Sequence, residues 1–192
     1  MASHGHNGRA GQGETAGGSA DSPRITLATL AKMSAEGRPF ACLTCYDSTT
    51  AKWLARGGVH VLLVGDTAAE MVLGLPRTLD MPLEGLIALT AGVERGGPDV
   101  VVMADMPFMS YQADDAEALR NAGRFVREGL ADIVKLEVDA SFAPLVEKMT
   151  RAGIPVCAHV GSKPQHVALT SGYASAGRTA DEARRVVDDA VA

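Results

Sequence analysis

Two aspartates each close a short apolar run, and this pairing is the strongest chemical signal in the sequence. Asp66 follows the run His60–Gly65, and Asp105 ends the run Val100–Asp105. Short runs rich in Val and Leu are typical of strands buried on both faces of a parallel sheet. Such folds place their chemistry at the carboxyl edge of the sheet, where both aspartates would lie. Paired carboxylates there suit a hard divalent cation, although a single aspartate at a strand end is commonly a loop or cap residue.

Further polar residues follow the same pattern in later runs. Lys135 and Glu137 stand two residues apart in the predicted strand Asp132–Glu137, so their side chains project from one face. In a barrel that face is the interior, where a lysine can bind a substrate carboxylate. His159 ends the predicted strand Ile154–His159. The simpler alternatives are a solvated ion pair for the first two residues and a hydrogen-bonded strand-end histidine for the third.

For three other candidate residues, Asp47, Cys42 and Cys45, a structural role explains the sequence better than a chemical one. Asp47 precedes a helical segment and is better explained as a helix N-cap than as a ligand. Cys42 and Cys45 form a C-x-x-C pair, but their odd offset places them on opposite faces of a strand, and the sequence holds no second pair. A zinc or redox role is therefore disfavoured. The total of three cysteines fits a reducing compartment better than a disulfide framework.

Composition narrows the class of protein. The 192 residues are 46% hydrophobic and 21% charged, as expected for a globular domain. A net charge of −5 gives no basic field that would attract nucleic acid or anionic lipid. The apolar runs are too short or too charged to cross a bilayer, and the N-terminus shows no secretory h-region. These features predict a cytoplasmic protein that binds neither nucleic acid nor membrane.

Strands and helices alternate along most of the chain. Residues 1–23 are rich in Gly, Ala and Ser and are predicted to form a disordered tail, and residues 24–192 form the predicted domain. A leading helix is predicted over Ile25–Glu36. The predicted strands are Phe40–Tyr46, His60–Gly65, Val100–Asp105, Asp132–Glu137 and Ile154–His159. Helices are predicted from Asp47 or Ser48 to Arg56, over Glu84–Arg95, Ala113–Glu128 and Ser141–Ala152, and from Thr179, with a long loop over Thr67–Leu83.

This alternation predicts right-handed βαβ crossovers and a parallel sheet. Both an open doubly wound sheet and a TIM-type (β/α)₈ barrel remain compatible with it. Charged groups at the ends of at least three strands favour the barrel, because catalytic residues of a barrel come from many strand ends. A barrel typically needs about 250 residues, and only about five βα units follow the leading helix here. We therefore expect an incomplete barrel, either a fragment or one completed by a partner.

A set of short motifs resembles the ketopantoate hydroxymethyltransferase (3-methyl-2-oxobutanoate hydroxymethyltransferase) family. The resemblance covers about Ile25 to Ala192 in the family's order, and the motifs are specific only as a set. They are LVGD (63–66), LPRTLDMPL (75–83), VERGGP (93–98), ADMPFMSY (104–111), NAGRFV (121–126), VKLE (134–137), GIPVCAHVG (153–161) and KPQ (163–165).

The resemblance implies a fold, a reaction and a set of site residues. It implies a (β/α)₈ barrel in a large homo-oligomer. It also implies Mg²⁺-assisted transfer of a hydroxymethyl group from 5,10-methylenetetrahydrofolate to 3-methyl-2-oxobutanoate, giving 2-dehydropantoate for pantothenate synthesis. The metal would be held by Asp66, Asp105 and Glu137, and the small 2-oxoacid would be bound by Asp66, Thr67, Asp105, Lys135 and His159. The family's general-base glutamate would follow a sixth strand beyond Ala192, so we expect no catalytic base in this chain.

The chain also departs from the family pattern. Thr67 replaces the family's serine and keeps the hydroxyl, whereas Ala68–Met71 replaces a Leu-Gly-Met segment and brings an extra acid, Glu70, towards the expected pocket mouth. Val138 stands where the family has glycine, which would be unfavourable if that position needs a positive φ. These departures leave two alternatives open. One is a Mg²⁺-dependent C–C lyase acting on a related 2-oxoacid or a phosphoenolpyruvate-type substrate, and the other is an inactive partial barrel acting as an assembly partner.

Overall fold

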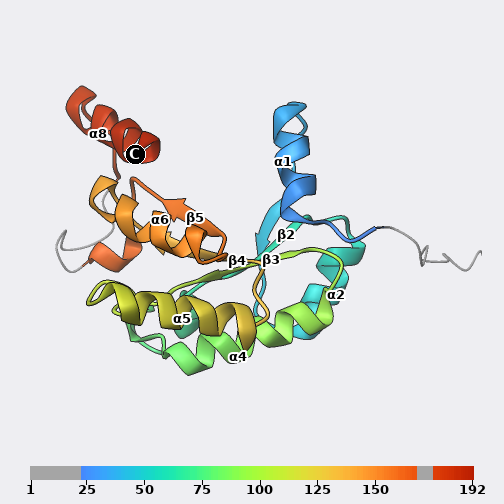
Figure 1. Cartoon of the computed structure of the whole chain (residues 1–192). Helices are drawn as coiled ribbons and strands as arrows, with labels where there is room; N and C mark the ends of the chain where they lie inside the picture. Colours follow the sequence, from blue (N-terminus) through green and yellow to red (C-terminus); the bar gives the residue numbers. More distant parts are fainter. Residues whose placement is uncertain (1–22, 168–174) are drawn as a thin grey trace, which may run out of the picture.

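The computed structural model describes residues 23–167 and 175–192, and its centre is a parallel five-stranded sheet. The strand order β1-β2-β3-β4-β5 follows the order of the chain. An open doubly wound sheet would reverse direction at a switch point, whereas here each strand simply adds beside its predecessor. The sheet is therefore an arc of a barrel (Figure 1). Its strands are β1 (Cys42–Thr44), β2 (Val61–Val64), β3 (Val101–Asp105), β4 (Ile133–Glu137) and β5 (Val156–His159).

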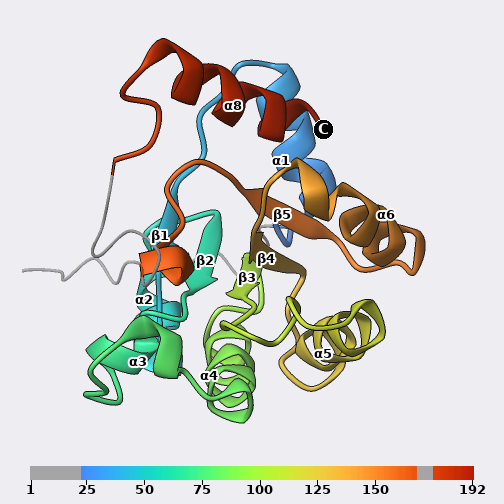
Figure 2. The ribbon, with the colours of Figure 1, turned by 90° about the vertical axis from the view of Figure 1, so that its left-hand side faces the viewer.

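Helices cover the outer face of this arc. Figure 2 shows α4 and α5 side by side beneath β3 and β4, and α4 also packs against α2. The α-helices are α1 (Leu27–Ala35), α2 (Ser48–Arg56), α3 (Ala68–Met71), α4 (Leu83–Gly96), α5 (Asp115–Arg127), α6 (Ala143–Arg151) and α8 (Ala180–Val191). Short 3-10 turns are η1 (Thr78–Asp80), η2 (Ala140–Phe142) and η3 (Pro164–His166).

The core lies between the sheet and these helices. Leu62, Val102 and Val134 are fully buried on β2, β3 and β4. They meet helix side chains such as Leu86 and Phe125 in one hydrophobic cluster. Residues buried from both sides of a strand explain why the apolar runs in the sequence are continuous instead of alternating.

Side chains at the helix starts explain where the helices begin. Asp47 is the N-cap of α2 and accepts hydrogen bonds from the backbone N–H groups of Thr49 and Thr50, which confirms the predicted cap. Thr179 and Glu182 form the predicted capping box at α8. An acidic or hydroxyl side chain at this position satisfies backbone donors that the helix itself leaves unpaired.

Two predictions about local structure were wrong. The strand predicted over Phe40–Tyr46 is only three residues long, so Cys45 lies beyond its end. The region Thr67–Leu83, predicted as a long loop, contains α3 and η1. Glu70 accepts hydrogen bonds from the backbone N and the hydroxyl of Thr78, at 2.8 and 2.9 Å, and so ties α3 to η1. The predicted disordered tail falls almost entirely on residues 1–22, outside the described residues.

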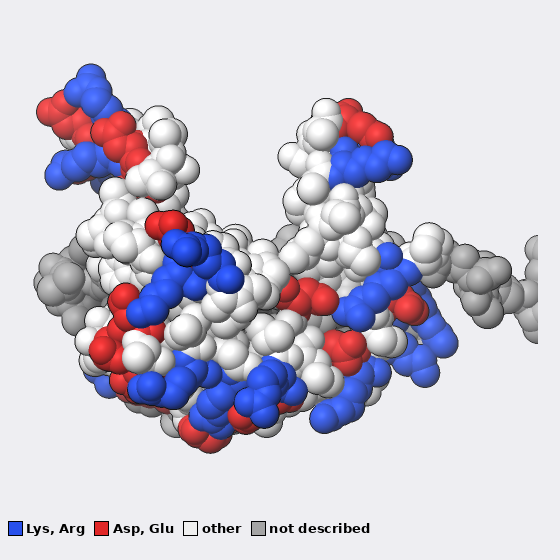
Figure 3. Space-filling model, viewed as in Figure 1, with Lys and Arg blue, Asp and Glu red and all other residues white. Residues whose placement is uncertain are grey.

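The outer surface carries charges of both signs. On the face shown in Figure 3, Lys and Arg side chains alternate with Asp and Glu over α4 and α5. Arg124, for example, forms ion pairs with Glu84 and Glu128. Among the described residues, the helices are too short or too polar to span a membrane.

Candidate functional site

The carboxyl ends of β2, β3 and β4 bring four of the predicted site residues together. Asp66, Asp105 and Glu137 are 4%, 6% and 5% exposed. The backbone N–H of Asp66 donates to Asp105 Oδ2 at 3.2 Å, and Lys135 Nζ lies 2.5 Å from Asp105 Oδ1. The prediction that the two aspartates share one edge of the sheet is therefore confirmed in its geometry.

Burial and mutual repulsion change the acidity of this cluster. Burial, followed by the charge of Asp105, raises the pKa of Asp66 to about 6, although hydrogen bonding from Gln165 and the charge of Lys135 oppose the rise. Burial also raises the pKa of Glu137 to about 7, against a backbone hydrogen bond from Gln165. Burial alone would lower the pKa of Lys135, but the charge and hydrogen bond of Asp105 outweigh it, and the pKa is raised. The site thus holds more negative than positive charge and favours an added cation.

Thr67 is held at the same edge by a residue from the end of β1. Its hydroxyl lies 2.8 Å from the Tyr46 hydroxyl. A Cβ atom added to Gly65 would meet Thr67 Oγ1 at 3.1 Å and Asp105 Oδ2 at 3.5 Å. The glycine before Asp66 therefore lets the Thr67 hydroxyl and the Asp105 carboxylate approach the backbone closely.

His159 lies beside Glu137 but is not hydrogen-bonded to it. The two residues are register partners on β5 and β4, and His159 Nδ1 is 3.7 Å from Glu137 Oε1. This nitrogen is buried and has no hydrogen-bond partner among the described residues. Burial, together with the charge of Lys135, lowers the pKa of His159, so the imidazole is neutral at pH 7.

Gln165 also belongs to the site, although the sequence pattern does not predict it. This residue is 3% exposed and lies in η3, after β5. Its backbone N–H donates to Glu137 Oε2 at 2.8 Å, and its side-chain Nε2 donates to Asp66 Oδ2 at 2.9 Å. The KPQ motif drew attention to the position, but a glutamine in a Pro-containing loop carries no spacing signal.

The donor set fits a magnesium ion bound by few protein ligands. Mg²⁺ usually takes one or two carboxylates and completes its coordination with water and substrate oxygens. Within residues 23–167 and 175–192, no three His, Cys, Asp or Glu side chains are arranged to hold one metal ion. The predicted metal-binding set Asp66, Asp105 and Glu137 therefore does not form a three-residue metal site in the described part of the structure.

The departures from the family pattern do not disturb this site. Glu70 accepts hydrogen bonds from Thr78, as described above, so its carboxylate is held against η1. The non-glycine residues with positive φ in the described chain are Met109 and Leu130. Val138 is not one of them, and its side chain is buried in the core, so valine causes no backbone strain there.

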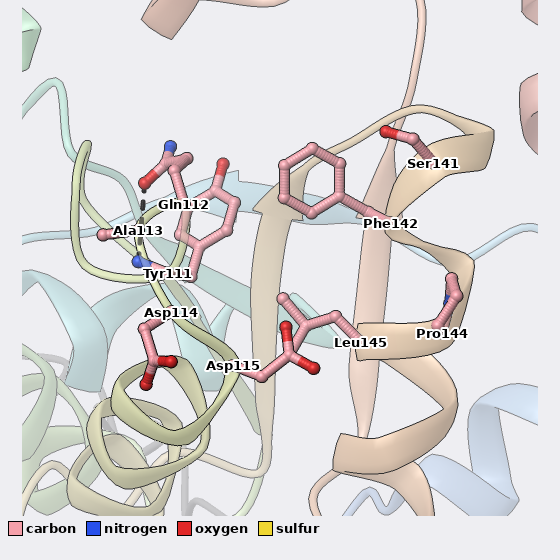
Figure 4. A pocket seen from close by; sticks show the side chains of 9 residues that line it. All are labelled: Tyr111, Gln112, Ala113, Asp114, Asp115, Ser141, Phe142, Pro144 and Leu145. Carbon is pink, nitrogen blue, oxygen red and sulfur yellow. Dashed lines mark hydrogen bonds between the residues drawn. The ribbon is translucent and has the colours of Figure 1, made fainter.

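A pocket of about 180 Å³ opens next to the site, between the starts of α5 and α6. Figure 4 shows the rings of Tyr111 and Phe142 along its upper side and the carboxylates of Asp114 and Asp115 below. The two rings meet edge to face, with centroids 6.0 Å apart. The Tyr111 hydroxyl reaches from this pocket to the backbone N–H of Glu137, which donates to it at 3.0 Å.

Sequence comparisons connect this geometry with known proteins. A family model described as ketopantoate hydroxymethyltransferase matches residues 24–192. The chain is 43% identical over 168 residues to the 3-methyl-2-oxobutanoate hydroxymethyltransferase of Hyperthermus butylicus, covering 88% of this chain and 58% of that one. It is 46% identical over 169 residues to the corresponding Mycobacterium avium protein, covering 88% and 59%. The chain thus spans less than two thirds of the length of these relatives.

Solved structures of similar shape support the barrel fold. The trigonal crystal form of 2,3-dimethylmalate lyase, a PEP mutase/isocitrate lyase superfamily member, aligns with a TM-score of 0.58 at 16% identity, covering 88% of this chain and 60% of that one. Oxaloacetate acetylhydrolase in complex with oxalate aligns with a TM-score of 0.52 at 15% identity, covering 71% and 53%. At these identities the likeness concerns the fold and not the reaction.

Proposed function

Because the chain belongs to the ketopantoate hydroxymethyltransferase family, we propose that it binds 3-methyl-2-oxobutanoate and Mg²⁺ for hydroxymethyl transfer from 5,10-methylenetetrahydrofolate. One observation carries this proposal. Asp66, Asp105 and Lys135 converge at the ends of adjacent strands, with Asp105 contacting both of the other residues. Two carboxylates and an ammonium group are what a chelating 2-oxoacid and its cation require.

Each residue of the cluster has a distinct role in this proposal. Asp66, Asp105 and Glu137 would hold Mg²⁺. Bound Mg²⁺ supplies a Lewis acid that stabilises negative charge developing on the ketone oxygen of the substrate. Lys135, held in place by Asp105, binds the substrate carboxylate as a point charge.

Thr67 and His159 complete the binding edge. The Thr67 hydroxyl, fixed by Tyr46, donates a hydrogen bond to a substrate oxygen. The neutral imidazole of His159 offers a buried nitrogen that lacks a partner within the described residues, and the substrate satisfies it. We assign no general base to residues of this chain.

The test is calorimetric binding of 3-methyl-2-oxobutanoate in Mg²⁺ and in chelator. We expect binding only with Mg²⁺, and we expect Asp105→Asn to weaken it at least tenfold, because this substitution removes a metal ligand and the partner of Lys135. Asp181→Asn, on the exposed side of α8, is the control and should bind as the unmodified chain does. Equal binding in chelator, or unchanged binding by Asp105→Asn, would refute the proposal.

A second measurement addresses the reaction class. Exchange of the C3 hydrogen of 3-methyl-2-oxobutanoate with solvent deuterium, followed by NMR, reports proton removal beside the ketone. The family relationship favours this substrate over those of C–C lyases, with which the chain shares only its fold. A homo-oligomer in the cytoplasm is the setting that we propose for this activity.

A further inference from the structure

Gln165 connects acidic residues that belong to separate strands. It follows β5 in the chain, yet it contacts residues at the ends of β2, β3 and β4. Sequence separation between Gln165 and Asp66 is 99 residues. A single buried residue therefore joins the segment after β5 to the Asp66 and Glu137 carboxylates.

The side-chain amide of Gln165 has four polar partners, one of which, the Tyr111 hydroxyl, shares its single proton between Gln165 Oε1 and the Glu137 carbonyl oxygen. Nε2 donates to Asp66 Oδ2 at 2.9 Å and to the carbonyl oxygen of Met106 at 3.0 Å. Oε1 lies 2.9 Å from the Tyr111 hydroxyl and accepts a hydrogen bond from Gln112 Nε2 at 2.9 Å. Two donors and two acceptor sites are the full complement of a glutamine amide.

This network permits only one orientation of the amide. Rotating the amide by 180° would bring Oε1 against the Asp66 carboxylate and the Met106 carbonyl, so that oxygens would face oxygens. It would also direct Nε2 at the donating amide of Gln112. The Tyr111 hydroxyl at one end and the Met106 carbonyl at the other hold the amide even without Gln112, so an N–H group is presented to Asp66 Oδ2 in a fixed direction.

The backbone of Gln165 makes the second connection. Its N–H donates to Glu137 Oε2 at 2.8 Å, and this contact survives any change of side chain. One residue thus holds both carboxylates that flank Asp105, one through its side chain and one through its main chain.

We propose that Gln165 is a positioning residue that fixes the Asp66 carboxylate for cation binding. The inference deepens the proposed function and rests on it. Residues that hydrogen-bond a ligating carboxylate orient it, and their loss typically weakens metal binding by about 10- to 100-fold. Simple packing does not explain the glutamine, because an apolar side chain of equal length would fill the same space with four fewer polar contacts.

The test compares variants that remove the hydrogen bond between Gln165 and Asp66 with a variant that removes the hydrogen bond between Gln112 and Gln165. Gln165→Met keeps the length of the side chain and the backbone contact to Glu137, but it removes the donor to Asp66. Gln112→Met removes a donor to Gln165 Oε1 and leaves the contact with Asp66 intact. Gln165→Asn keeps an amide one methylene shorter, which cannot reach both ends, and serves if the methionine variant does not fold.

Binding of Mg²⁺ alone, measured by calorimetry without substrate, is the first readout. We expect at least tenfold weaker binding in Gln165→Met, weakening also in Gln165→Asn, and a change within about twofold in Gln112→Met. Equal affinity of Gln165→Met and the unmodified chain would overturn the positioning role. If the unmodified chain binds no Mg²⁺, the proposed function fails instead.

Metal-free crystal structures of the same variants provide a readout independent of metal binding. We expect the Asp66 side chain to keep one conformation in Gln112→Met and to change rotamer in Gln165→Met and Gln165→Asn. An unchanged Asp66 conformation in both Gln165 variants would overturn the proposal, whatever the metal affinity.

Discussion

Asp105 and Lys135 are register partners on adjacent parallel strands, and their side chains form an ion pair at 2.5 Å. Parallel pairing places the two Cα atoms side by side, so both side chains point into the same space. The pair is largely buried, with the Lys135 and Asp105 side chains 16% and 8% exposed. The ammonium group that we assign to substrate binding is thus held by a carboxylate that we assign to the metal.

Replacing Lys135 by methionine should weaken both stability and binding. The substitution leaves Asp105 buried without its partner, and breaking a buried pair from one side costs roughly 3 kcal/mol. Urea unfolding should show this loss, and calorimetry should show at least tenfold weaker binding of the 2-oxoacid. Lys148→Met is the matched control, because its pair with Asp115 is about half exposed and is worth less than about 1 kcal/mol. A loss no larger than that of the control would contradict the prediction.

The buried carboxyl groups predict an unusual dependence of stability on pH. The folded chain holds the pKa of Asp66 at about 6 and that of Glu137 at about 7, above the values of about 4 in an unfolded chain. Between these values the folded state binds more protons than the unfolded state, so the free energy of unfolding decreases as pH rises. In chelator we expect each of the two carboxyl groups to contribute a loss of roughly 3 kcal/mol between about pH 4 and pH 8.

The variant Asp66→Asn isolates this effect. The lowered pKa values of His159 and His166 act in the opposite direction, but they do so in both proteins, and the difference between the two curves removes them. We expect that difference to develop between about pH 4 and pH 6, the pKa values of Asp66 in the unfolded and folded chain. Parallel stability curves for the two proteins would show that folding does not raise the pKa of Asp66.

Gly96 marks a close approach between two helices. A Cβ atom at this position of α4 would lie 2.1 Å from the Ser48 backbone oxygen at the start of α2, which is far closer than a non-bonded contact allows. Gly96→Ala should therefore force the helices apart and lower the midpoint of thermal unfolding, at a cost of about 2 kcal/mol. Gly92→Ala is the control on the same helix, where an added Cβ has nothing within 4 Å. It should be neutral or should stabilise by up to about 1 kcal/mol, and similar midpoints for the two variants would refute the steric argument.

We expect the role of Asp47 to be that of a helix N-cap and not that of a metal ligand. Its carboxylate caps α2 through Thr49 and Thr50, and the Thr50 hydroxyl bond contributes most to lowering its pKa. Asp47→Ala should cost about 1 kcal/mol in urea unfolding and leave Mg²⁺ affinity unchanged. Asp47→Ser, which retains a capping oxygen, should recover most of the stability. Weaker Mg²⁺ binding in both variants would instead indicate a ligand role.

Elements with strong periodicity could be predicted from the sequence, and short ones could not. The runs leading to Asp66 and Asp105 are apolar, β-branched and bounded by turn residues, so strands were the natural interpretation, and the structure has them. The strand predicted around Cys42 is shorter, since only Cys42–Thr44 pair in register with Val61–Leu63, although Ala41 and Cys45 still hydrogen-bond to the same segment. The helix α3 has four residues and η1 has three, which is too few for a hydrophobic period to appear.

The residues of the site also divide into those that the sequence predicts and those that it does not. Acids at strand ends could be predicted to meet, because parallel strands deliver their carboxyl ends to one edge. The contacts of Gln165 could not be predicted, because a polar residue in a loop belongs to no periodic pattern. They depend on how the loop after β5 folds back across three strands. The hydrogen bond between Glu70 and Thr78 was missed for a similar reason, because it depends on the turn formed by η1.

The agreement between strand order and chain order has a consequence for biosynthesis. A chain emerging from the ribosome can add each new strand to the one made just before it, without waiting for a distant partner. The carboxylates and the lysine of the site are synthesised by residue 137, but the glutamine that joins two of them comes 28 residues later. Cation binding during translation would therefore reach its full strength only once that loop has left the exit tunnel and packed against the edge of the sheet.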